Sequence, residues 1–318
     1  MFGIVRALRE KGILCINKRN ADYILRFNPR RLYPLVDDKL RTKMLAIEHR
    51  IAVPELYGVV QVEGQVRGVG AILDRYPEFV IKPARGSGGE GIVVVSGQAH
   101  GKYRKLLLTR DELNHHLFNV LSGMYSLGGQ PDNALIEYRV RFDPIFEGIS
   151  YLGVPDVRII VFLGIPVMSM VRLPTKSSDG KANLHQGAVG AGIDMATGTT
   201  LSGVWGNDIV TEHPDTGQPV EGVRIPHWDE LLSLAGRCQE AVGLGYIGVD
   251  IVLDRDKGPL ILELNARPGL NIQIANTSGL LWRLKCVESH FAELGSLAER
   301  IHFAKEQFGI NSTACQSA

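Results

Sequence analysis

The sequence predicts an α+β fold. Strand-like and helix-like segments mix along the chain without the regular strand–helix–strand alternation that produces a doubly wound sheet. The length of 318 residues is enough for two domains, or for one large domain divided into lobes. Hydrophobic residues make up 45% of the chain and charged residues 22%, which is ordinary for a globular protein.

Charge and hydropathy exclude several classes of protein. A formal net charge of +1 argues against a surface that binds polyanions over its whole extent, so no nucleic-acid partner is predicted. No apolar run approaches the roughly 20 residues that cross a bilayer, and the first residues do not resemble a signal peptide. Cys15, Cys238, Cys286 and Cys315 lie far apart with no CxxC motif. We therefore expect reduced cysteines and a cytoplasmic protein.

The first 125 or so residues predict two helices and three strands. A helix is expected from Asp37 or Asp38 to about Arg50, because an aspartate can cap its start and an apolar stripe follows. The letters TRDE at 109–112 resemble a capping box and predict a helix to about residue 125. Strands are expected at 56–62, 79–83 and 91–96.

The second half predicts more strands, with helices near its end. The segment 174–207 is rich in Gly, Ser, Thr and Asn, which is typical of loops and brief strands. Pro226 precedes a helical pattern that ends at a glycine. Helices are expected over much of 280–308, and the final letters STACQSA are expected to be disordered. Strands are predicted at 134–140, 157–163, 166–172, 246–253 and 259–265.

The letters VIKPARGSGGEG at 80–91 contain a literal G-x-G-x-x-G. A dinucleotide-binding turn would open a helix, but these glycines run into Ile92 and three valines, which favour a strand. A Walker A loop would need Gly-Lys-Ser/Thr, and a kinase loop would need H-R-D and D-F-G motifs, all absent from the sequence. We therefore predict a glycine hairpin whose backbone N–H groups bind phosphate, with Lys82 supplying a charge. A mobile surface hairpin is the alternative.

The letters GVDIVLDRDKGPLILELNARPG at 248–269 predict a second hairpin. If Leu253 faces Leu260, the same register places Asp250 opposite Glu263, with Asn265 on the same face. Like charges opposite one another destabilise a sheet pair, whereas two carboxylates and an amide oxygen suit a divalent cation such as Mg²⁺. A solvated polar face is the alternative interpretation.

These motifs, in this order, resemble those of the ATP-grasp superfamily: Lys82 in VIKP, the glycine hairpin, LIEY at 135–138, and the carboxylate hairpin. Within that superfamily the chain is similar to RimK-type α-L-glutamate ligases, through PDVR at 155–158, Arg172 and KANLHQGA at 181–188. The resemblance covers roughly residues 35–285. It implies an ATP-grasp fold in which two α/β lobes enclose ATP.

The resemblance also implies a role for each matching residue. Residues implied to bind ATP are Lys43, Lys82, Gly86, Ser87, Gly88, Gly89, Gly91, Glu137 and Tyr138. Residues implied to hold Mg²⁺ or Mn²⁺ are Asp250, Glu263 and Asn265. Residues implied to act in catalysis, on the substrate carboxylate or acylphosphate, are Arg158, Arg172 and Arg267. Asn183 and His185 are implied to line the same substrate pocket.

The implied reaction joins a carboxylate to an amine. The carboxylate attacks the γ-phosphate of ATP, and the amine then displaces phosphate from the acylphosphate to form an amide or peptide bond. The expected partners are ATP and small-molecule or peptide substrates, with glutamate as the family's usual amino acid. Two functions remain as alternatives: a non-catalytic nucleotide-binding regulator and an ATP-dependent phosphotransferase on the same fold.

The resemblance divides the chain into an N-terminal lobe at 1–36, a core at 37–290, and a helix with a flexible tail at 291–318. The core contains an ATP-lid part at about 52–140 and a metal and substrate part at about 141–290. The N-terminal lobe is shorter than is usual in the family. We therefore expect part of the acceptor site to be reduced, or to come from another subunit of a homo-oligomer. The added-looking segment after Glu137 leaves Asp143 and Glu147 both open as the ribose-binding acid.

Four of these residues have a simpler interpretation. Lys43 could be a solvated lysine on a helix, and Glu137 a surface residue at a strand end. Arg158 could form a structural ion pair with Asp156, and His185 could bond within its own loop.

Overall fold

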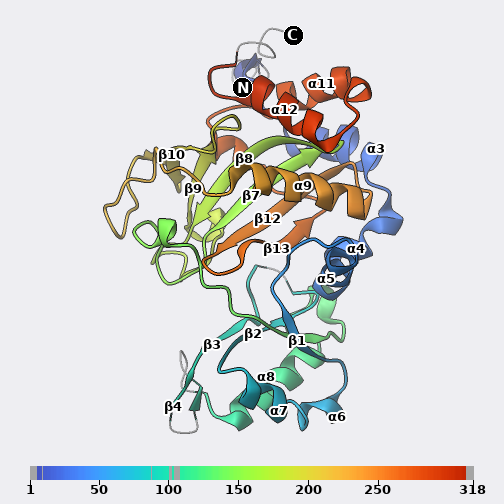
Figure 1. The fold of residues 1–318 in the computed structure, drawn as a ribbon, viewed down its shortest axis with the longest axis vertical. Coiled ribbons are helices and arrows are strands. Elements are labelled where there is room, and N and C mark those ends of the chain that lie inside the picture. Colours follow the sequence, from blue (N-terminus) through green and yellow to red (C-terminus); the bar gives the residue numbers. More distant parts are fainter. Residues whose placement is uncertain (1–5, 9, 87, 100–101, 104–107, 313–318) are drawn as a thin grey trace. The chain divides into compact units, whose positions relative to one another are not determined.

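The computed structural model describes residues 6–8, 10–86, 88–99, 102–103 and 108–312 (Figure 1). The chain divides into two compact units. The large unit comprises residues 1–36, 45–52 and 141–318, and the small unit comprises residues 37–44 and 53–140. The predicted domain boundaries stay a prediction.

A four-stranded antiparallel sheet forms the centre of the small unit (Figure 1). Its strands lie in the order β1 (Leu56–Val60), β6 (Ala134–Glu137), β2 (Glu78–Pro83) and β3 (Val93–Ser96). Its helices are α6 (Glu63–Val66), α7 (Gly70–Arg75) and α8 (Arg110–Leu121), with the 3₁₀ turn η3 (Leu127–Gly129). Strands β4 (Gln98–Ala99) and β5 (Lys102–Tyr103) pair separately. Helix α5 (Lys39–Glu48) has its first residues in this unit.

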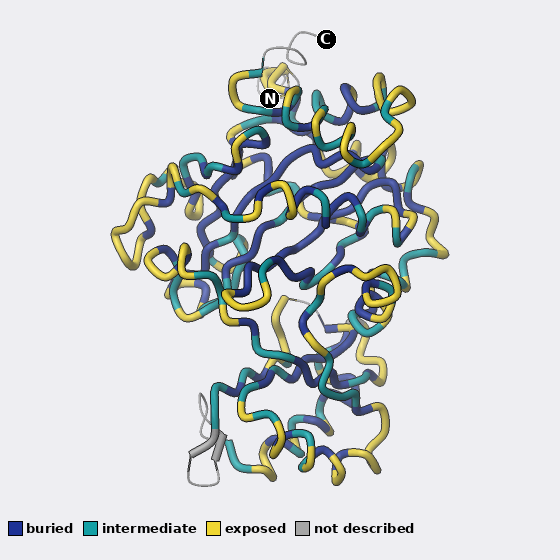
Figure 2. The backbone as a smooth tube through the Cα atoms, in the orientation of Figure 1, coloured by how far each residue is buried: buried dark blue, intermediate teal, exposed yellow. Residues whose placement is uncertain are grey.

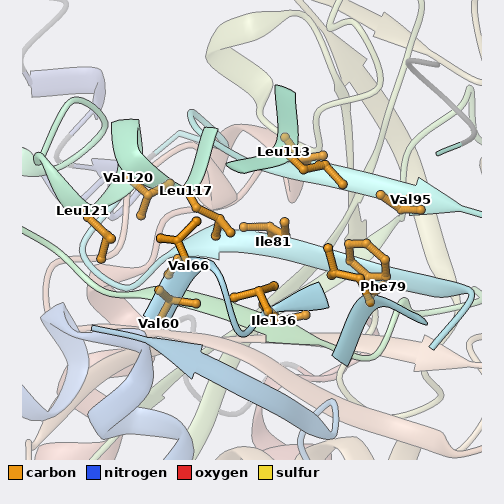
Figure 3. Close-up of a cluster of buried hydrophobic side chains, with 14 residues drawn as sticks. Val60, Val66, Phe79, Ile81, Val95, Leu113, Leu117, Val120, Leu121 and Ile136 are labelled. Carbon is orange, nitrogen blue, oxygen red and sulfur yellow. The ribbon is translucent and has the colours of Figure 1, made fainter. Parts of the chain in front are cut away.

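The core of the small unit lies between its sheet and helix α8 (Figure 3). Phe79 and Ile81 alternate with outward residues along β2 and are fully buried, because side chains two positions apart share a face of a strand. They pack in one cluster with Leu113 and Leu117, which lie one helical turn apart on α8. The predicted capping box is confirmed: Thr109 accepts from the backbone N–H of Glu112 at 3.2 Å.

A seven-stranded antiparallel sheet forms the centre of the large unit. Its central strands are buried along most of their length (Figure 2). The strands lie in the order β11 (Asp208–Val210), β10 (Thr200–Trp205), β9 (Val189–Ile193), β8 (Ile165–Leu173), β7 (Asp156–Phe162), β12 (Tyr246–Asp254) and β13 (Gly258–Asn265).

Helix α9 (Trp228–Val242) packs on strands β7, β8, β12 and β13, and α12 (Leu297–Phe308) packs on α9 and β8 (Figure 1). Helix α10 (Ile272–Ala275) contacts β8, β9 and β10, and α11 (Leu281–His290) contacts β8. The 3₁₀ turns of this unit are η4 (Pro144–Phe146), η5 (Leu184–Gln186) and η6 (Phe291–Glu293). No helix of the described residues is long and apolar enough to cross a membrane.

The N-terminal residues form short helices that pack into the large unit. Tyr23 is buried between Phe162 of β7 and Tyr246 of β12, with ring centroids at 5.4 and 6.2 Å. The helices are α2 (Ile16–Lys18), the π-helix η1 (Arg19–Ile24), α3 (Leu25–Phe27), the 3₁₀ turn η2 (Arg30–Leu32) and α4 (Pro34–Asp37).

The predicted pairing of the carboxylate hairpin is right at one end and wrong at the other. Asp250 pairs with Glu263, as expected, but Leu253 pairs with Pro259 rather than with Leu260. The register shifts between Asp250 and Ile251, because β13 carries one extra residue there. Such a β-bulge places two residues of one strand opposite one of its partner.

Two further predictions have a structural outcome. The glycine hairpin is confirmed, since β2 and β3 pair antiparallel with Ile81 opposite Val93. The expectation that the cysteines are reduced is wrong for Cys286, which is disulfide-bonded, while Cys15 and Cys238 are free. The predicted disordered tail, from residue 313 onward, lies outside the described residues.

Candidate active site

One face of the seven-stranded sheet carries a row of charged side chains. Residues directly opposite one another on neighbouring antiparallel strands point to the same face. Glu263 pairs with Asp250, and Asp250 pairs with Arg158. On the next pair of strands, Asp156 lies opposite Arg172. The pairing of β13 with β12, of β12 with β7 and of β7 with β8 therefore brings these side chains together. The side chains come from four separate strands.

Two arginines and two aspartates of this row form one ion-pair network. Arg158 donates to both carboxylate oxygens of Asp250, at 2.7 and 2.6 Å. Arg172 donates to both oxygens of Asp156, at 2.6 Å each, and also to Asp250 at 2.8 Å. Asp156 and Asp250 are only 4% and 1% exposed, so their charges depend on these partners. Arg158 thus pairs with Asp250, not with Asp156.

The two buried carboxylates have opposite pKa shifts. Burial raises the pKa of Asp156 to about 6, against the opposing effect of Arg172 and with the help of the Asp250 charge. Burial would also raise the pKa of Asp250, but Arg158 and Arg172 outweigh it and lower this pKa to about 2. The pKa of Arg172 is raised, because the two carboxylates outweigh the effect of its own burial. Arg172 is therefore charged throughout the physiological range.

Each arginine keeps one terminal nitrogen available. The hydrogen bonds of Arg158 and Arg172 to described residues use Nε and Nη2, and none uses Nη1. Both side chains line a pocket that encloses about 290 Å³ of space, part of it open to solvent. The other lining residues are Met170, Asn183, Leu184, His185, Gly269 and Asn271. The pocket therefore offers two guanidinium donors to a planar or tetrahedral oxyanion.

The far wall of this pocket is formed by η5 and by the chain after β13. Asn183 accepts from the backbone N–H of His185 at 3.0 Å, so its side chain shapes the turn that carries the histidine. His185 itself lies 3.4 Å, Nε2 to Nδ2, from Asn271. His185 therefore has a hydrogen bond within its own loop and one contact outside it. The absence of a side chain at Gly190 leaves space for Leu184 of η5, because a Cβ at position 190 would lie 2.5 Å from the Leu184 side chain.

The chemistry of Asp250, Glu263 and Asn265 fits a hard divalent cation. All three side chains offer oxygen, and the Asn265 amide nitrogen lies 3.4 Å from Asp250. A carboxylate has about four lone-pair positions, two on each oxygen. In Asp250 the two arginines donate one hydrogen bond to Oδ1 and two to Oδ2. Asp250 therefore has free capacity at Oδ1 only. Among the residues that the structure describes, no cluster of three His, Cys, Asp or Glu side chains suits a metal.

A second charged cluster lies in the small unit. Lys43 of α5 and Lys82 of β2 both form ion pairs with Glu137 of β6, the first at 2.9 Å. Lys43 also donates to the carbonyl of Pro54. The three side chains are 4%, 5% and 2% exposed, so neither Lys43 nor Glu137 is a solvated surface residue. Burial lowers the pKa of Lys43, against the Glu137 charge, and Lys82 lowers it further.

The cluster carries two positive charges and one negative charge. Such a site keeps one uncompensated ammonium, which would attract an anion such as phosphate. Glu137 belongs to this cluster through its side chain, whereas its neighbour Tyr138 donates its backbone N–H to Glu55 at 2.8 Å.

The glycine loop between β2 and β3 is held at both of its ends. Lys39 donates to the carbonyl of Gly86 at 2.6 Å, and Nε2 of His116 lies 3.0 Å from the carbonyl oxygen of Gly91. Gly88, Gly89 and Gly91 have φ values of 64°, 79° and 71°, which residues with a Cβ rarely adopt. Ser87 lies outside the described residues.

The structure does not bring Arg267 to the pocket. Its guanidinium lies 5.2 Å from the ring centroid of Tyr33, on the exposed part of the loop after β13. The candidates Asp143 and Glu147 are engaged elsewhere: Asp143 accepts from the backbone N–H of Ile145 at 2.9 Å, and Glu147 pairs with Arg255 at 2.6 Å.

Sequence reasoning missed Asp156 and Asn271 as site residues. Asp156 lies two positions before Arg158 and one residue before the predicted strand 157–163, so starting that strand one residue earlier would have assigned it to the same face as Arg158. Nothing in the sequence indicates Asn271, because its approach to His185 depends on a fold contact between residues 86 positions apart.

The comparison with protein families gives one match, to the family described as sugar-transfer associated ATP-grasp, over residues 18–289. The chain belongs to this ATP-grasp family. The match covers both the small unit with its lysine cluster and the strands that carry the charged row. The predicted ATP-grasp fold of the α+β class is confirmed, and so is the ATP-grasp superfamily. The narrower RimK-type assignment is not confirmed.

The solved structures to which the chain is similar are distant in sequence. The ATP-grasp ligase PsnB, complexed with a minimal precursor, is 14% identical with a TM-score of 0.46, over 84% of this ATP-grasp chain and 64% of PsnB. The D-cycloserine synthetase DcsG is 17% identical with a TM-score of 0.49, over 82% and 72%. D-alanine–D-alanine ligase from Bacillus anthracis is 14% identical with a TM-score of 0.44, over 86% and 68%.

The ATP-grasp chain spans less than two thirds of PsnB, at 60 to 64% of its length in three complexes. No curated protein matches the sequence.

Proposed function

We propose that this ATP-grasp protein is an ATP- and Mg²⁺-dependent ligase that joins a carboxylate to an amine. The observation that carries the proposal is the pair of arginines, Arg158 and Arg172, which line one pocket and are both hydrogen-bonded to Asp250. A carboxylate or an acylphosphate presents the oxygens that such donors bind. Membership of the ATP-grasp family supplies the expectation that ATP is the energy source.

Two chemical steps would follow one another. A carboxylate oxygen attacks the γ-phosphorus of ATP, and the bond from that phosphorus to the β-phosphate bridging oxygen breaks, which releases ADP. The amine nitrogen then attacks the carbonyl carbon of the acylphosphate, loses a proton, and releases inorganic phosphate. Arg158 and Arg172 would hold the charged oxygens in both steps, because their own positions are fixed by buried carboxylates.

The small unit would contribute the phosphate contacts. Lys43 and Lys82 supply two ammonium groups against the single charge of Glu137, and the glycine loop supplies backbone N–H groups. Tyr138 is proposed to lie at the adenine edge, and Ser87 to bind phosphate with the glycines. Arg267 is proposed to reach a substrate oxyanion only after leaving its contact with Tyr33.

Glu263, Asn265 and Oδ1 of Asp250 would hold Mg²⁺, or Mn²⁺ in its place. When bound, the cation neutralises charge on the phosphate oxygens. Mg²⁺ prefers oxygen ligands, and all three side chains offer oxygen.

The narrower proposals concern specificity and setting. RimK-type chemistry would add glutamate or another amino acid to an amine or peptide acceptor. Asn183 and His185, with their side chains in or beside the pocket, would recognise the substrate. A cytoplasmic location and a homo-oligomeric state belong to the proposal as well.

The test is a screen for ADP release with amino acids and short peptides, followed by mass spectrometry of the product. The proposal expects ADP, phosphate and a new amide. ADP with a stable phosphorylated product would identify a phosphotransferase instead. ATP binding without turnover on any acid and amine would favour the nucleotide-binding regulator.

A further inference from the structure

The loop that completes the substrate pocket is bordered by the N-terminal segment. Gly269 and Asn271, which line the pocket, lie on the connection 266–271 between β13 and α10. We name this connection, together with the first two residues of α10, loop 266–273. We name the N-terminal residues 12–33 the clamp segment. Every contact considered below lies within the large unit.

The clamp segment contacts the loop before the pocket residues. Arg19 donates from Nη1 to the carbonyl of Pro268 at 2.7 Å, and its side chain is buried, with 7% of the residue exposed. Asn28 donates to the carbonyl of Ala266 at 3.0 Å, and it also bonds to both backbone groups of Tyr246. The ring of Tyr33 lies under Arg267.

The clamp segment also contacts the chain after the pocket residues. Gln273 exchanges two hydrogen bonds with the backbone of Leu14, at 2.8 and 3.1 Å, and it is 5% exposed. The same amide oxygen accepts from the backbone N–H of Leu280 at 2.9 Å. Pocket residues 269 and 271 therefore lie between two buried points of attachment to one N-terminal segment.

The burial of the Arg19 guanidinium is unfavourable, because it removes a charged group from water. Burial lowers its pKa, Tyr246 opposes that effect, and the nearby charge of Arg267 lowers the pKa further. Within the part of the chain that the structure describes, its other hydrogen bonds reach only the adjacent Asn20, at 3.1 and 2.8 Å. A buried guanidinium that no described carboxylate pairs with must have its donors satisfied by other hydrogen bonds, and the long-range one is to the pocket loop.

We propose that the clamp segment holds loop 266–273 in the shape that the substrate pocket requires, and that Arg19 is a positioning residue of that pocket. Arg19 does not touch the pocket itself: it acts through Pro268, one residue before Gly269. The proposal deepens the function proposed above, and part of its test does not depend on that function.

The first measurement is hydrogen–deuterium exchange, read by mass spectrometry, on the wild-type protein, Arg19→Met and Arg26→Met. Arg26 is the matched control, because it lies in the same segment but is exposed and pairs with Glu288. Loss of a hydrogen bond from a charged group should speed exchange in peptides covering 269–275 by about tenfold or more in Arg19→Met. Exchange in β7 should be unchanged, and Arg26→Met should match the wild type.

Equal exchange of the loop in Arg19→Met and the wild type would overturn the proposal. So would an equal acceleration in β7, since that would mean a general loss of stability. If Arg19→Met does not fold, Arg19→Lys replaces it, because lysine keeps the charge and N–H donors but lacks the planar fork of the guanidinium. The loop of Arg19→Lys should exchange at a rate above that of the wild type, and an unchanged rate would again count against the clamp.

The second measurement uses the acid found by the ADP-release screen. Arg19→Met should raise the KM for that acid by about tenfold, with the KM for ATP unchanged, and Arg19→Lys should recover part of the loss. An unchanged KM for the acid would refute the positioning role even if the loop exchanges faster. If the screen finds no turnover at all, the proposed function fails, and the exchange experiment still decides whether the clamp exists.

Discussion

Arg172 donates through Nη2 to Asp250 at 2.8 Å, although the two residues lie 78 positions apart. The same nitrogen donates to Asp156, so one guanidinium compensates two buried carboxylates. Replacing it by methionine leaves Asp156 without its bidentate partner. We expect Arg172→Met to lower the free energy of unfolding by about 3–5 kcal/mol, as measured by urea denaturation.

The control for that prediction is Arg255→Gln, which breaks an exposed ion pair with Glu147. Its expected cost is below about 1 kcal/mol. If the two variants lose similar amounts of unfolding free energy, the buried network stabilises the protein no more than a surface ion pair does.

The raised pKa of Asp156 predicts that the free energy of unfolding depends on pH. Its pKa of about 6 in the folded protein exceeds the ordinary value of 3.8, so the folded state keeps a proton that the unfolded state has released. Stability from this group is complete below about pH 4 and is lost as the pH rises through 6. Asp250 titrates below this window, because its pKa is lowered to about 2.

The measurement compares wild type and Asp156→Asn by urea denaturation between pH 4 and pH 7. The wild type should lose on the order of 2–3 kcal/mol relative to the variant across this range. Parallel pH profiles for the two proteins would show that Asp156 does not titrate in this window.

Glu137 compensates the charges of Lys43 and Lys82. Glu137→Gln would leave two buried ammonium groups without a carboxylate, so we expect a loss of about 3–5 kcal/mol in unfolding free energy at pH 7. The loss should shrink at alkaline pH, because burial already lowers the pKa of Lys43 and deprotonation removes the excess charge. Denaturation at pH 7 and pH 9.5 tests this, with Glu147→Gln as an exposed control. A loss that is the same at both pH values would contradict it.

Two glycines of the glycine loop between β2 and β3 should respond differently to alanine. Both have positive φ, 64° for Gly88 and 71° for Gly91, which costs about 1–2 kcal/mol with a Cβ. A Cβ at Gly91 would also lie 2.5 Å from the ring of Tyr125, whereas at Gly88 it would meet nothing within 4 Å. Gly91→Ala should therefore destabilise the protein by about 1–3 kcal/mol more than Gly88→Ala. Equal melting temperatures would refute the predicted contact with Tyr125.

Among the proposed metal ligands, Glu263 has the clearest test. Glu263→Gln keeps the shape of the side chain but removes its charge, so we expect Mg²⁺-dependent ADP formation to fall at least about 100-fold with the fold intact. The control is Glu221→Gln, an exposed residue whose carboxylate accepts from Ser202 at 2.9 Å. Normal turnover in Glu263→Gln would remove this residue from the proposed metal site.

Local patterns in the sequence predicted what depends on neighbours along the chain. The pairing of Asp250 with Glu263 and the glycine hairpin follow from side-chain alternation and from β-branched residues close to a turn. The bulge was missed, because it shifts the register by one residue without any change in which apolar residues the strand carries.

Contacts between distant segments could not be predicted in this way. The sequence indicates that Arg158 and Asp250 matter, but not that they bond to each other, because this depends on β7 lying beside β12. The sequence left a surface residue open as an alternative for Glu137, and its burial depends on β6 lying between β1 and β2. The order of strands within a sheet, not their identity, was the missing information.

The clamp segment also bears on how the chain acquires its structure during synthesis. Arg19 and Pro268 are 249 positions apart, and Asn28 and Ala266 are 238 apart. At ribosomal rates of about 5–20 residues per second, the first partner waits roughly 10–50 seconds for the second. For most of that interval Tyr23 lacks one of its two aromatic partners, because Tyr246 of β12 is synthesised long after Phe162 of β7. The last quarter of the chain therefore decides when its beginning can fold.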